Sequence, residues 1–289
     1  MAPASDATGP GQPMRLKDKI AIVVGAGQTP GQTIGNGRAT AITFAREGAR
    51  VLCADRDLAS AEETVAEIAR GDGEAVALAA DVTDEASLVA MVGFCVERWG
   101  RIDVLHNNVG VCMAGGDKVL EEITADSFDN VMAINLRGMV MTCKLAVPVM
   151  LRQGSGAIVN ISSTAARGLN PFVAYRASKA GVIAFTQQLA FRYAGDGIRA
   201  NCILPGLMDT PMAIEERVRN WGQSHEKVRA DRDAQVPLRH KMGTAWDVAN
   251  AALFLASDEA SFVSGVSLPV DGGALVFVGP AGGRAPDDS

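Results

Sequence analysis

Residues 19–48 decide the fold, and they read KIAIVV (19–24), GAGQTPGQTIGNG (25–37) and RATAITFAREG (38–48). The first segment is a β-branched apolar run, which is typical of a strand buried on both faces of a parallel sheet. The last segment has helical periodicity and ends at Gly48. A strand, a glycine-rich turn and a helix in this order aim backbone N–H groups at a phosphate. The stretch therefore predicts a phosphate-binding turn.

A second expected strand, residues 49–55, ends at Asp55, about twenty residues beyond the turn. A carboxylate at this place can accept hydrogen bonds from an adenosine ribose and repel a 2′-phosphate. Asp55 therefore favours NAD over NADP. Arg56 is the counter-argument, because its guanidinium could receive that phosphate.

Strands and helices continue to alternate along the chain. Further strands are expected at 75–80, 102–107, 156–161, 198–203 and 266–270, and helices at 59–70, 84–99, 127–152, 172–194 and 245–256. We expect Asp84 or Thr83 to cap the helix at 84–99, and Pro148 to interrupt the helix at 127–152. Seven strands alternating with helices predict an α/β fold: one Rossmann-like, doubly wound sheet of mostly parallel strands with helices on both faces.

The polar and glycine residues of interest fall at the ends of the expected strands. In doubly wound sheets the ligand crevice lies outside the carboxyl ends of the strands. Residues at those ends are Gly25, Asp55, Asp81, Asn107, Ser162, Ser163, Pro205 and Gly206. Their shared placement predicts that they line one crevice.

Tyr175 and Lys179 lie four residues apart in an expected helix. This spacing places both side chains on one face, about one turn apart. An ammonium beside a phenol favours phenolate, so we expect Lys179 to lower the pKa of Tyr175 towards neutrality. The pair then predicts a general base or acid.

Composition excludes several classes of function. The 289-residue chain has a formal net charge of −6 and shows no basic patch, which argues against nucleic acid or an anionic membrane as a partner. Its five cysteines are scattered and its three histidines dispersed, so we expect no disulfide framework and no metal site. We interpret the cysteines as the reduced thiols of a cytoplasmic protein. Residues 1–14 are expected to form a disordered leader, 15–278 one domain and 279–289 a flexible tail.

From about residue 16 to residue 273 the chain resembles the short-chain dehydrogenase/reductase family. The sequence Asn107-Asn108-Val109-Gly110 is similar to the family's Asn-Asn-Ala-Gly element, which steadies the central sheet and approaches the adenosine side. Asp81-Val82 matches the pair that contacts adenine. The segment 205–210 (PGLMDT) matches the one that holds the nicotinamide carboxamide, through the Met208 backbone and the Thr210 hydroxyl.

The resemblance implies the site residues. Asn135, Ser163, Tyr175 and Lys179 match the catalytic tetrad, in which Asn135 would hold a water that relays protons from Lys179. The residues implied in cofactor binding are Gly25, Gly35, Asn36, Gly37, Asp55, Arg56, Asp81, Val82, Asn108, Gly110, Tyr175, Lys179, Pro205, Gly206, Met208 and Thr210.

Two features depart from the family pattern. The first glycine turn usually reads Gly-x-x-x-Gly-x-Gly, but here six extra residues precede Gly35, so we interpret residues 28–33 as an insertion beside the pyrophosphate. The alternative register, Gly25-Ala26-Gly27 followed by Pro30, loses the third glycine. The spacing from Ser163 to Tyr175 is one residue shorter than usual, and counting back gives Ser162. We choose Ser163 because a strand end fixes geometry more firmly than a loop length.

The resemblance implies NAD-dependent hydride transfer between nicotinamide and a secondary alcohol or ketone. Alternatives are an NADP-dependent ketone reductase and a catalytically silent nucleotide sensor. A pocket without a fixed charge would suit a hydrophobic or aromatic substrate, and its expected lining is Met113, Ala114, Leu169, Phe172, Met208 and Met212. Residues 211–240 are expected to form a mobile lid or a solvated helical pair. We expect a homotetramer or homodimer, with the apolar segment 274–278 packed on a neighbouring subunit or over the active site.

Overall fold

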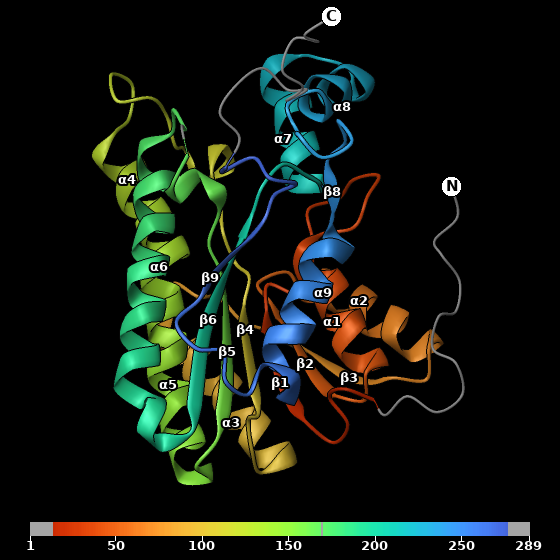
Figure 1. Cartoon of the computed structure of the whole chain (residues 1–289), viewed down its shortest axis with the longest axis vertical. Helices are drawn as coiled ribbons and strands as arrows, with labels where there is room; N and C mark the ends of the chain where they lie inside the picture. Colours follow the sequence, from red (N-terminus) through yellow and green to blue (C-terminus); the bar gives the residue numbers. More distant parts are fainter. Residues whose placement is uncertain (1–13, 169, 277–289) are drawn as a thin grey trace, which may run out of the picture.

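A seven-stranded parallel sheet forms the centre of the molecule (Figure 1). The computed structural model describes residues 14–168 and 170–276. The strands, in spatial order, are β3 (Glu74–Ala79), β2 (Arg50–Asp55), β1 (Ile20–Val24), β4 (Val104–Asn107), β5 (Gly156–Ile161), β6 (Ile198–Pro205) and β9 (Ser267–Val270). All six pairings are parallel. The predicted α/β sheet of seven strands is confirmed.

Strand β1 lies where the direction of winding reverses. It pairs with β2 on one side and with β4 on the other, and all five of its residues are buried. The chain adds β2 and β3 on one side of β1, and then β4, β5, β6 and β9 on the other. A ligand crevice is expected at such a reversal, beyond the carboxyl ends of β1 and β4.

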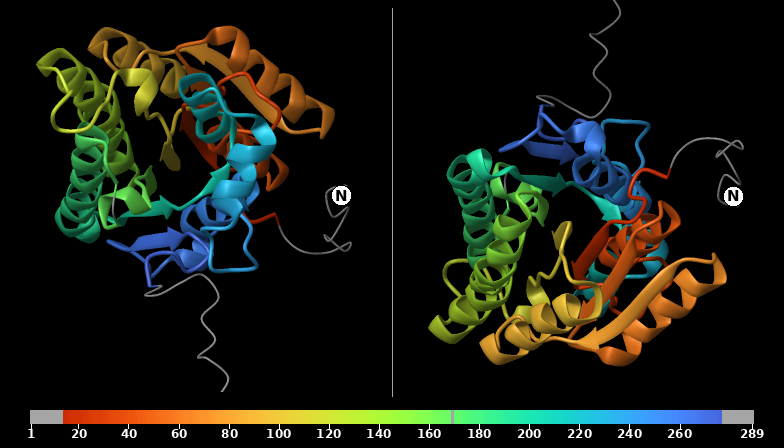
Figure 2. Two further views of the ribbon diagram at one scale, coloured as in Figure 1. Left: turned by 90° about the horizontal axis from the view of Figure 1, so that it is seen from above. Right: turned by 90° about the horizontal axis from the view of Figure 1, so that it is seen from below.

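Helices cover both faces of the sheet (Figure 2). Their bounds are α1 (Asn36–Arg46), α2 (Leu58–Arg70), α3 (Glu85–Trp99), α4 (Ala125–Met132), α5 (Gly138–Gln153), α6 (Val173–Tyr193), α7 (Pro211–Trp221), α8 (His225–Asp233) and α9 (Ala245–Ala256). One apolar cluster joins α1, α2 and α9 to one face, and a second joins α3, α5 and α6 to the other. The core therefore consists of two layers, one on each side of the sheet.

The long helical stretch before β5 differs from its prediction. Pro148 lies inside α5 without ending it, and a π-helical turn at Ala133–Arg137 joins α4 to α5 instead. Residues 125–153 form one helical stretch that is long and apolar enough to cross a membrane by length and composition. Half of its most apolar window is buried inside the molecule, as in the core helix of a globular protein.

Two short helices lie above the carboxyl ends of the strands. They are α7 and α8, and they follow β7 (Met208–Asp209), which pairs with β8 (Gly243–Thr244). These helices enclose a small apolar cluster of Ile214, Val228, Val236 and Met242. The segment predicted as a lid or a helical pair is thus a helical pair with its own core.

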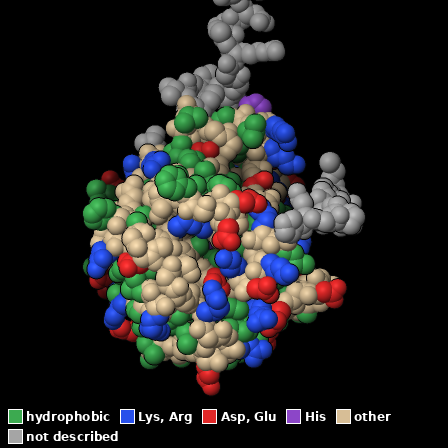
Figure 3. All heavy atoms as spheres, turned by 60° about the horizontal axis from the view of Figure 1, so that its bottom comes forward, with side chains coloured by type: hydrophobic (Ala, Val, Ile, Leu, Met, Phe, Trp, Pro, Cys, Tyr) green, Lys and Arg blue, Asp and Glu red, His purple; other side chains and the backbone are tan. Residues whose placement is uncertain are grey.

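Charged side chains of both signs are mixed on the surface. On the face that Figure 3 shows, acidic and basic side chains are interspersed.

The apolar segment near the carboxyl end is partly packed on the molecule itself. Leu275 packs beside Met139, Val182 and Leu204, whereas the next residue, Val276, is 83% exposed. Of the segment expected to pack on a neighbour or over the active site, residues 277 and 278 lie outside the described part.

Candidate active site

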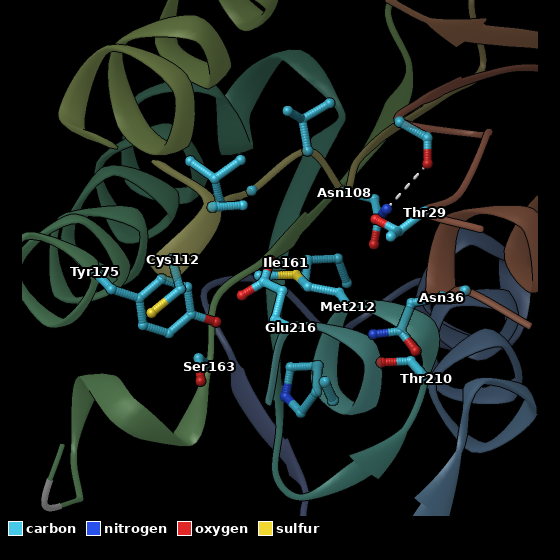
Figure 4. Close-up of a pocket in the computed structure, with 18 of the residues that line it drawn as sticks. Thr29, Asn36, Asn108, Cys112, Ile161, Ser163, Tyr175, Thr210, Met212 and Glu216 are labelled. Carbon is cyan, nitrogen blue, oxygen red and sulfur yellow. Dashed lines mark hydrogen bonds between the residues drawn. The ribbon is translucent and has the colours of Figure 1, made fainter. Parts of the chain in front are cut away.

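A cleft of about 970 Å³ opens at the carboxyl ends of the strands. One end is lined by the glycine turn after β1 and the other by α6, α7 and the loop after β4. Figure 4 shows labelled side chains from both ends around this cavity, among them Asn36 and Thr210 at one end and Tyr175 and Cys112 at the other. The cleft collects the residues predicted from the strand ends except Asn107, which is buried in the core and donates from Nδ2 to Asn160 Oδ1 at 2.8 Å.

The glycine turn has no room for side chains. Gly25 has a φ of +85°, and a Cβ on Gly37 would lie 1.9 Å from the Gly25 carbonyl oxygen. Asn108 donates from Nδ2 to that oxygen at 3.0 Å, which is the dashed line in Figure 4. Helix α1 begins at Asn36 directly behind the turn, so its N-terminal N–H groups face the cleft. This cradle fits the phosphates of a dinucleotide.

The insertion at residues 28–33 is a braced loop. Gln28 Oε1 accepts from the Gly35 N–H at 2.9 Å, and the Ser60 hydroxyl accepts from the Gln28 N–H at 2.9 Å. At its tip, Gln32 Oε1 accepts from Arg229 of α8 at 3.0 Å, and the same Arg229 also binds Asp209. The insertion therefore connects the glycine turn to the α7–α8 helical pair across the cleft.

Acidic groups surround the end of β2. Asp55 Oδ2 accepts from the Gly27 N–H at 2.9 Å, and its Oδ1 accepts from the Asp57 N–H at 3.1 Å. Asp81 and Arg56 line the same part of the cleft. Hydrogen bonds from Thr83 hold the pKa of Asp81 below its usual value. Three carboxylates, those of Asp55, Asp57 and Asp81, thus meet one guanidinium at this end of the cleft.

Asp117 positions the helix that carries Tyr175. Its Oδ1 accepts from the Ala174 N–H at 3.1 Å and its Oδ2 from the Tyr175 N–H at 2.6 Å. The N-cap residue of α6, Phe172, makes no side-chain cap of its own. Sequence reasoning missed Asp117, because no local pattern links it to a helix 57 residues further along the chain.

Two adjacent serines point to different partners. Ser162 is 2% exposed, and its hydroxyl donates to the Lys179 carbonyl oxygen at 2.7 Å. The Ser163 hydroxyl accepts from the Ala165 N–H at 3.1 Å and lies near enough to the Tyr175 phenol for hydrogen bonding to lower the phenol's pKa, and Figure 4 shows both groups at the cleft. The geometry therefore brings Ser163, rather than Ser162, to the phenol oxygen.

The pKa of Tyr175 moves in the direction opposite to the predicted one. Burial raises it to about 12, although the Ser163 hydrogen bond opposes the rise. Lys179 lies with Nζ 5.7 Å from the centre of the Tyr175 ring and donates to the Ile161 carbonyl oxygen at 3.0 Å. Burial lowers the pKa of Lys179 to about 8. Desolvation thus outweighs the expected attraction between the two groups, because burial penalises both charged forms.

Asn135 lies behind the cleft, in the π-helical turn. It is fully buried, accepts from the Val111 N–H at 2.8 Å and donates to the Val111 carbonyl oxygen at 2.9 Å. It also donates to the Ser178 hydroxyl at 3.1 Å. Asn135 therefore connects the loop after β4 to the helix that carries Tyr175 and Lys179, without lining the cleft itself.

Comparisons with known proteins agree with this geometry. A family model described as enoyl-(acyl carrier protein) reductase matches residues 31–274. A crystal structure of a short-chain dehydrogenase/reductase from Burkholderia xenovorans superimposes with a TM-score of 0.87 at 41% identity, covering 92% of this chain and 99% of the other. This chain belongs to the short-chain dehydrogenase/reductase family.

Two named proteins of known reaction type are similar to this chain over most of their length. The 2-(R)-hydroxypropyl-CoM dehydrogenase of Xanthobacter autotrophicus is 38% identical, over 88% of this chain and 97% of the relative. Levodione reductase of Leifsonia aquatica is 36% identical, over 90% and 95%, respectively. A crystal structure of levodione reductase has a TM-score of 0.85 at 34% identity, covering 91% of this chain and all of the other.

The substrate end of this short-chain dehydrogenase/reductase differs from its prediction in charge. Met113, Ala114, Phe172, Met208 and Met212 line the cleft as expected, whereas Leu169 lies outside the described residues. However, Glu216, Arg217, Arg219 and Arg232 line it too. The expectation of a pocket without fixed charges was wrong, because the Arg- and Glu-rich segment folds into α7 and α8 directly above the cleft.

Proposed function

We propose that this protein is an NAD-dependent oxidoreductase that transfers a hydride between nicotinamide and a secondary alcohol or ketone. The observation that carries the proposal is the meeting of Tyr175, Ser163 and Lys179 in a cleft whose far end is the glycine cradle. A relative named as the dehydrogenase of a hydroxypropyl compound and another named levodione reductase support this reaction class.

The bound dinucleotide would supply the nicotinamide ring that accepts or returns the hydride. The chain would hold it with Gly25, Gly35 and Gly37 at the phosphates, Asp55 at the adenosine ribose and residues 205–210 at the carboxamide. The absence of space for a Cβ at Gly37 supports this fit, since backbone N–H groups can then approach phosphate closely.

Tyr175 and the side chains around it have separate roles in proton transfer and substrate binding. The Tyr175 phenolate takes the proton of the alcohol, and the phenol returns it to a carbonyl oxygen in the reverse direction. Ser163 binds the same substrate oxygen and orients it. Lys179 supplies a positive charge beside the phenol and binds the nicotinamide ribose, while Asn135 fixes the helix that carries both residues.

The preference for NAD follows from charge at the end of β2. A 2′-phosphate would approach the carboxylates of Asp55, Asp57 and Asp81, and Arg56 is the cation among the residues that follow β2 and β3 and line this part of the cleft. Repulsion by three carboxylates opposes attraction by one guanidinium. Arg56 favours the second candidate, an NADP-dependent ketone reductase, and a comparison of the two cofactors decides between them.

We also propose that the chain forms a homotetramer or homodimer in the cytoplasm. Large apolar side chains support self-association, since Phe191 is 87% exposed and Phe262 is fully exposed. Light scattering tests the assembly, and a monomer at micromolar concentration would contradict it.

The reaction is tested by following reduced nicotinamide at 340 nm across a panel of secondary alcohols, with NAD and with NADP. We expect turnover with NAD, and a loss of about 10²–10⁴-fold in Tyr175→Phe. Binding of NADH, measured by its fluorescence, should remain nearly unchanged in this variant. If Tyr175→Phe keeps most of the wild-type rate, the assignment of the acid/base is wrong.

A further inference from the structure

We propose that the substrate carries a second hydroxyl group, which donates a hydrogen bond to Glu216 while its reacting oxygen lies at Tyr175 and Ser163. The substrate class is then a neutral diol or hydroxyketone with an otherwise apolar skeleton. This inference rests on the proposed function and deepens it.

Glu216 is a carboxylate placed inside the substrate end of the cleft. It lies on α7, it is 5% exposed and it lines the cleft. In Figure 4 its side chain projects from α7 into the cavity that also holds Tyr175 and Cys112. Burial raises the pKa of both of these groups, and the charge of Glu216 adds to the rise.

The carboxylate has few partners within the protein. Burial raises the pKa of Glu216, and the rise is opposed by the charges of Arg217 and Arg219 and by the backbone N–H of Ala114. Among the described residues, no Lys, Arg or His nitrogen lies within 4.0 Å of its oxygens. An ionised carboxylate can accept about four hydrogen bonds, and a buried one with acceptor positions left over is costly. A ligand that brings a hydrogen-bond donor to this place would remove that cost.

Arg217 limits the charge of the ligand group that can donate to Glu216. Its Nη1 donates to the Ala213 carbonyl oxygen of its own helix at 2.7 Å, and its guanidinium lies 5.3 Å from the centre of the Trp221 ring. It therefore stays beside Glu216 without forming an ion pair with it. A cationic donor such as an ammonium would be attracted by Glu216 but repelled by Arg217.

Glu216 opposes an anion only close to its own oxygens. A carboxylate or sulfonate could be attracted by Arg217, Arg219 or Arg232, which also line the cleft, but it would be repelled where it approached Glu216. A hydroxyl group has no net charge and donates well to a carboxylate. Met113, Phe172 and Met212 line the same end of the cleft, so the skeleton between the two oxygens is expected to be hydrocarbon.

The test compares probes that share one skeleton: cyclohexanol, 1,2- and 1,3-cyclohexanediol, and 2-aminocyclohexanol, with 3-hydroxybutyrate as an anionic secondary alcohol. Each is assayed with NAD on wild type, Glu216→Gln and Glu216→Met. Glu226→Gln is the matched control, because Glu226 is an exposed carboxylate on the neighbouring helix α8. Melting temperature and NADH binding establish that each variant is folded.

We expect wild type to favour a diol over cyclohexanol in kcat/KM by at least about tenfold, the effect of one charge-assisted hydrogen bond. This preference should shrink in Glu216→Gln and vanish in Glu216→Met, through loss of diol turnover and not of cyclohexanol turnover. Glu226→Gln should keep the wild-type preference.

Three results would overturn the inference while leaving the proposed function intact. They are equal use of cyclohexanol and the diols by wild type, equal loss of both substrates in the Glu216 variants, and a preference for 2-aminocyclohexanol or 3-hydroxybutyrate. If no probe and no alcohol of the wider panel is turned over, the proposed function itself fails. If Glu216→Met does not fold, the comparison with the isosteric Glu216→Gln decides.

Discussion

The Asp117 carboxylate accepts the backbone N–H of Tyr175 at 2.6 Å, so a loop residue holds the first turn of the helix that presents the proposed catalytic base. Asp117 is 1% exposed and binds two N–H groups that no residue of the helix can satisfy. Because helix N-termini carry partial positive charge, an ionised carboxylate is the favoured partner here.

Replacing Asp117 by Asn should therefore lower both stability and rate. Asn has one acceptor oxygen and would turn an NH2 group towards a second N–H, which leaves a buried donor unpaired. We expect the free energy of unfolding to fall by about 1.5–3 kcal/mol. Urea unfolding measures the stability, and kcat reports the shift of Tyr175. The control is Asp126→Asn, which removes an exposed carboxylate from α4; equal effects of the two variants would contradict the role of Asp117.

The two serines at the end of β5 should separate in a pair of variants. Ser163→Ala should lower kcat by about 10²–10³-fold, the usual cost of losing one donor to a reacting oxygen. Ser162→Ala removes the hydrogen bond to the Lys179 carbonyl oxygen, so it should mainly lower the free energy of unfolding, by about 1 kcal/mol. Steady-state kinetics and urea unfolding on both variants give the answer. A larger kcat loss in Ser162→Ala would reverse the assignment.

The sheet could be predicted from sequence because its signals are local. Most strands contain short apolar runs, such as residues 19–24, which are visible in the sequence without knowing what packs on them. The prediction that Pro148 interrupts the helix was wrong because it ignored where Pro148 lies on the helix. Both Pro148 and Lys144, whose carbonyl oxygen loses its donor, are exposed on α5, so water can replace the missing hydrogen bond.

The lining of the cleft could be predicted in part, but its electrostatics could not. Gly25, Asp55 and Ser163 lie at strand ends and line the cleft, as topology requires, whereas Asn135 is buried behind it and the roles of these residues stay predictions. The pKa of Tyr175 depends on how much solvent the fold removes, which no spacing reveals. Glu216 and Arg217 line the cleft because α7 lies above it, and α7 packs on a small apolar core that it shares with α8. No local sequence pattern reveals this placement.

The ionisation of Tyr175 can be followed directly, because the chain contains two tyrosines, Tyr175 and Tyr193. Burial raises the pKa of Tyr175 to about 12, so the phenol stays protonated at lower pH in the free protein. The 295 nm difference between wild type and Tyr175→Phe should therefore stay flat up to pH ~10. Addition of NAD should shift the phenolate signal to lower pH, since positive charge nearby favours phenolate. A signal near pH 7 without NAD would contradict the effect of burial.

Arg229 should control how long the cofactor stays bound. It bridges Gln32 of the inserted loop and Asp209 at the base of α7, and it thereby joins the two sides of the cleft. In Arg229→Ala these bonds are lost, so we expect NADH to dissociate about 2–10-fold faster. Stopped-flow fluorescence measures the rate. Lys227→Ala is the control, because Lys227 pairs with Asp231 on the exposed side of α8; equal rates in both variants would remove the bridge from consideration.

His106 should make the fold sensitive to acid. It is fully buried in β4, its ring meets Phe44 edge-on at 5.9 Å between centres, and neither ring nitrogen has a partner among the described residues. Burial lowers its pKa from 6.5 to about 3. Between these values the unfolded chain binds a proton that the folded protein excludes, so stability falls as pH falls, by up to about 1.4 kcal/mol per pH unit.

His106→Val tests this linkage without a new buried polar group. The variant places a β-branched residue that suits a strand and loses the titration, so its free energy of unfolding should depend less on pH between pH 4 and 6. The measured quantity is the difference in slope between the two proteins, from urea unfolding at several pH values, since all carboxylates contribute equally to both. His240→Asn, at an exposed histidine, should match the wild-type slope. Parallel curves for wild type and His106→Val would mean that His106 is protonated in the folded protein.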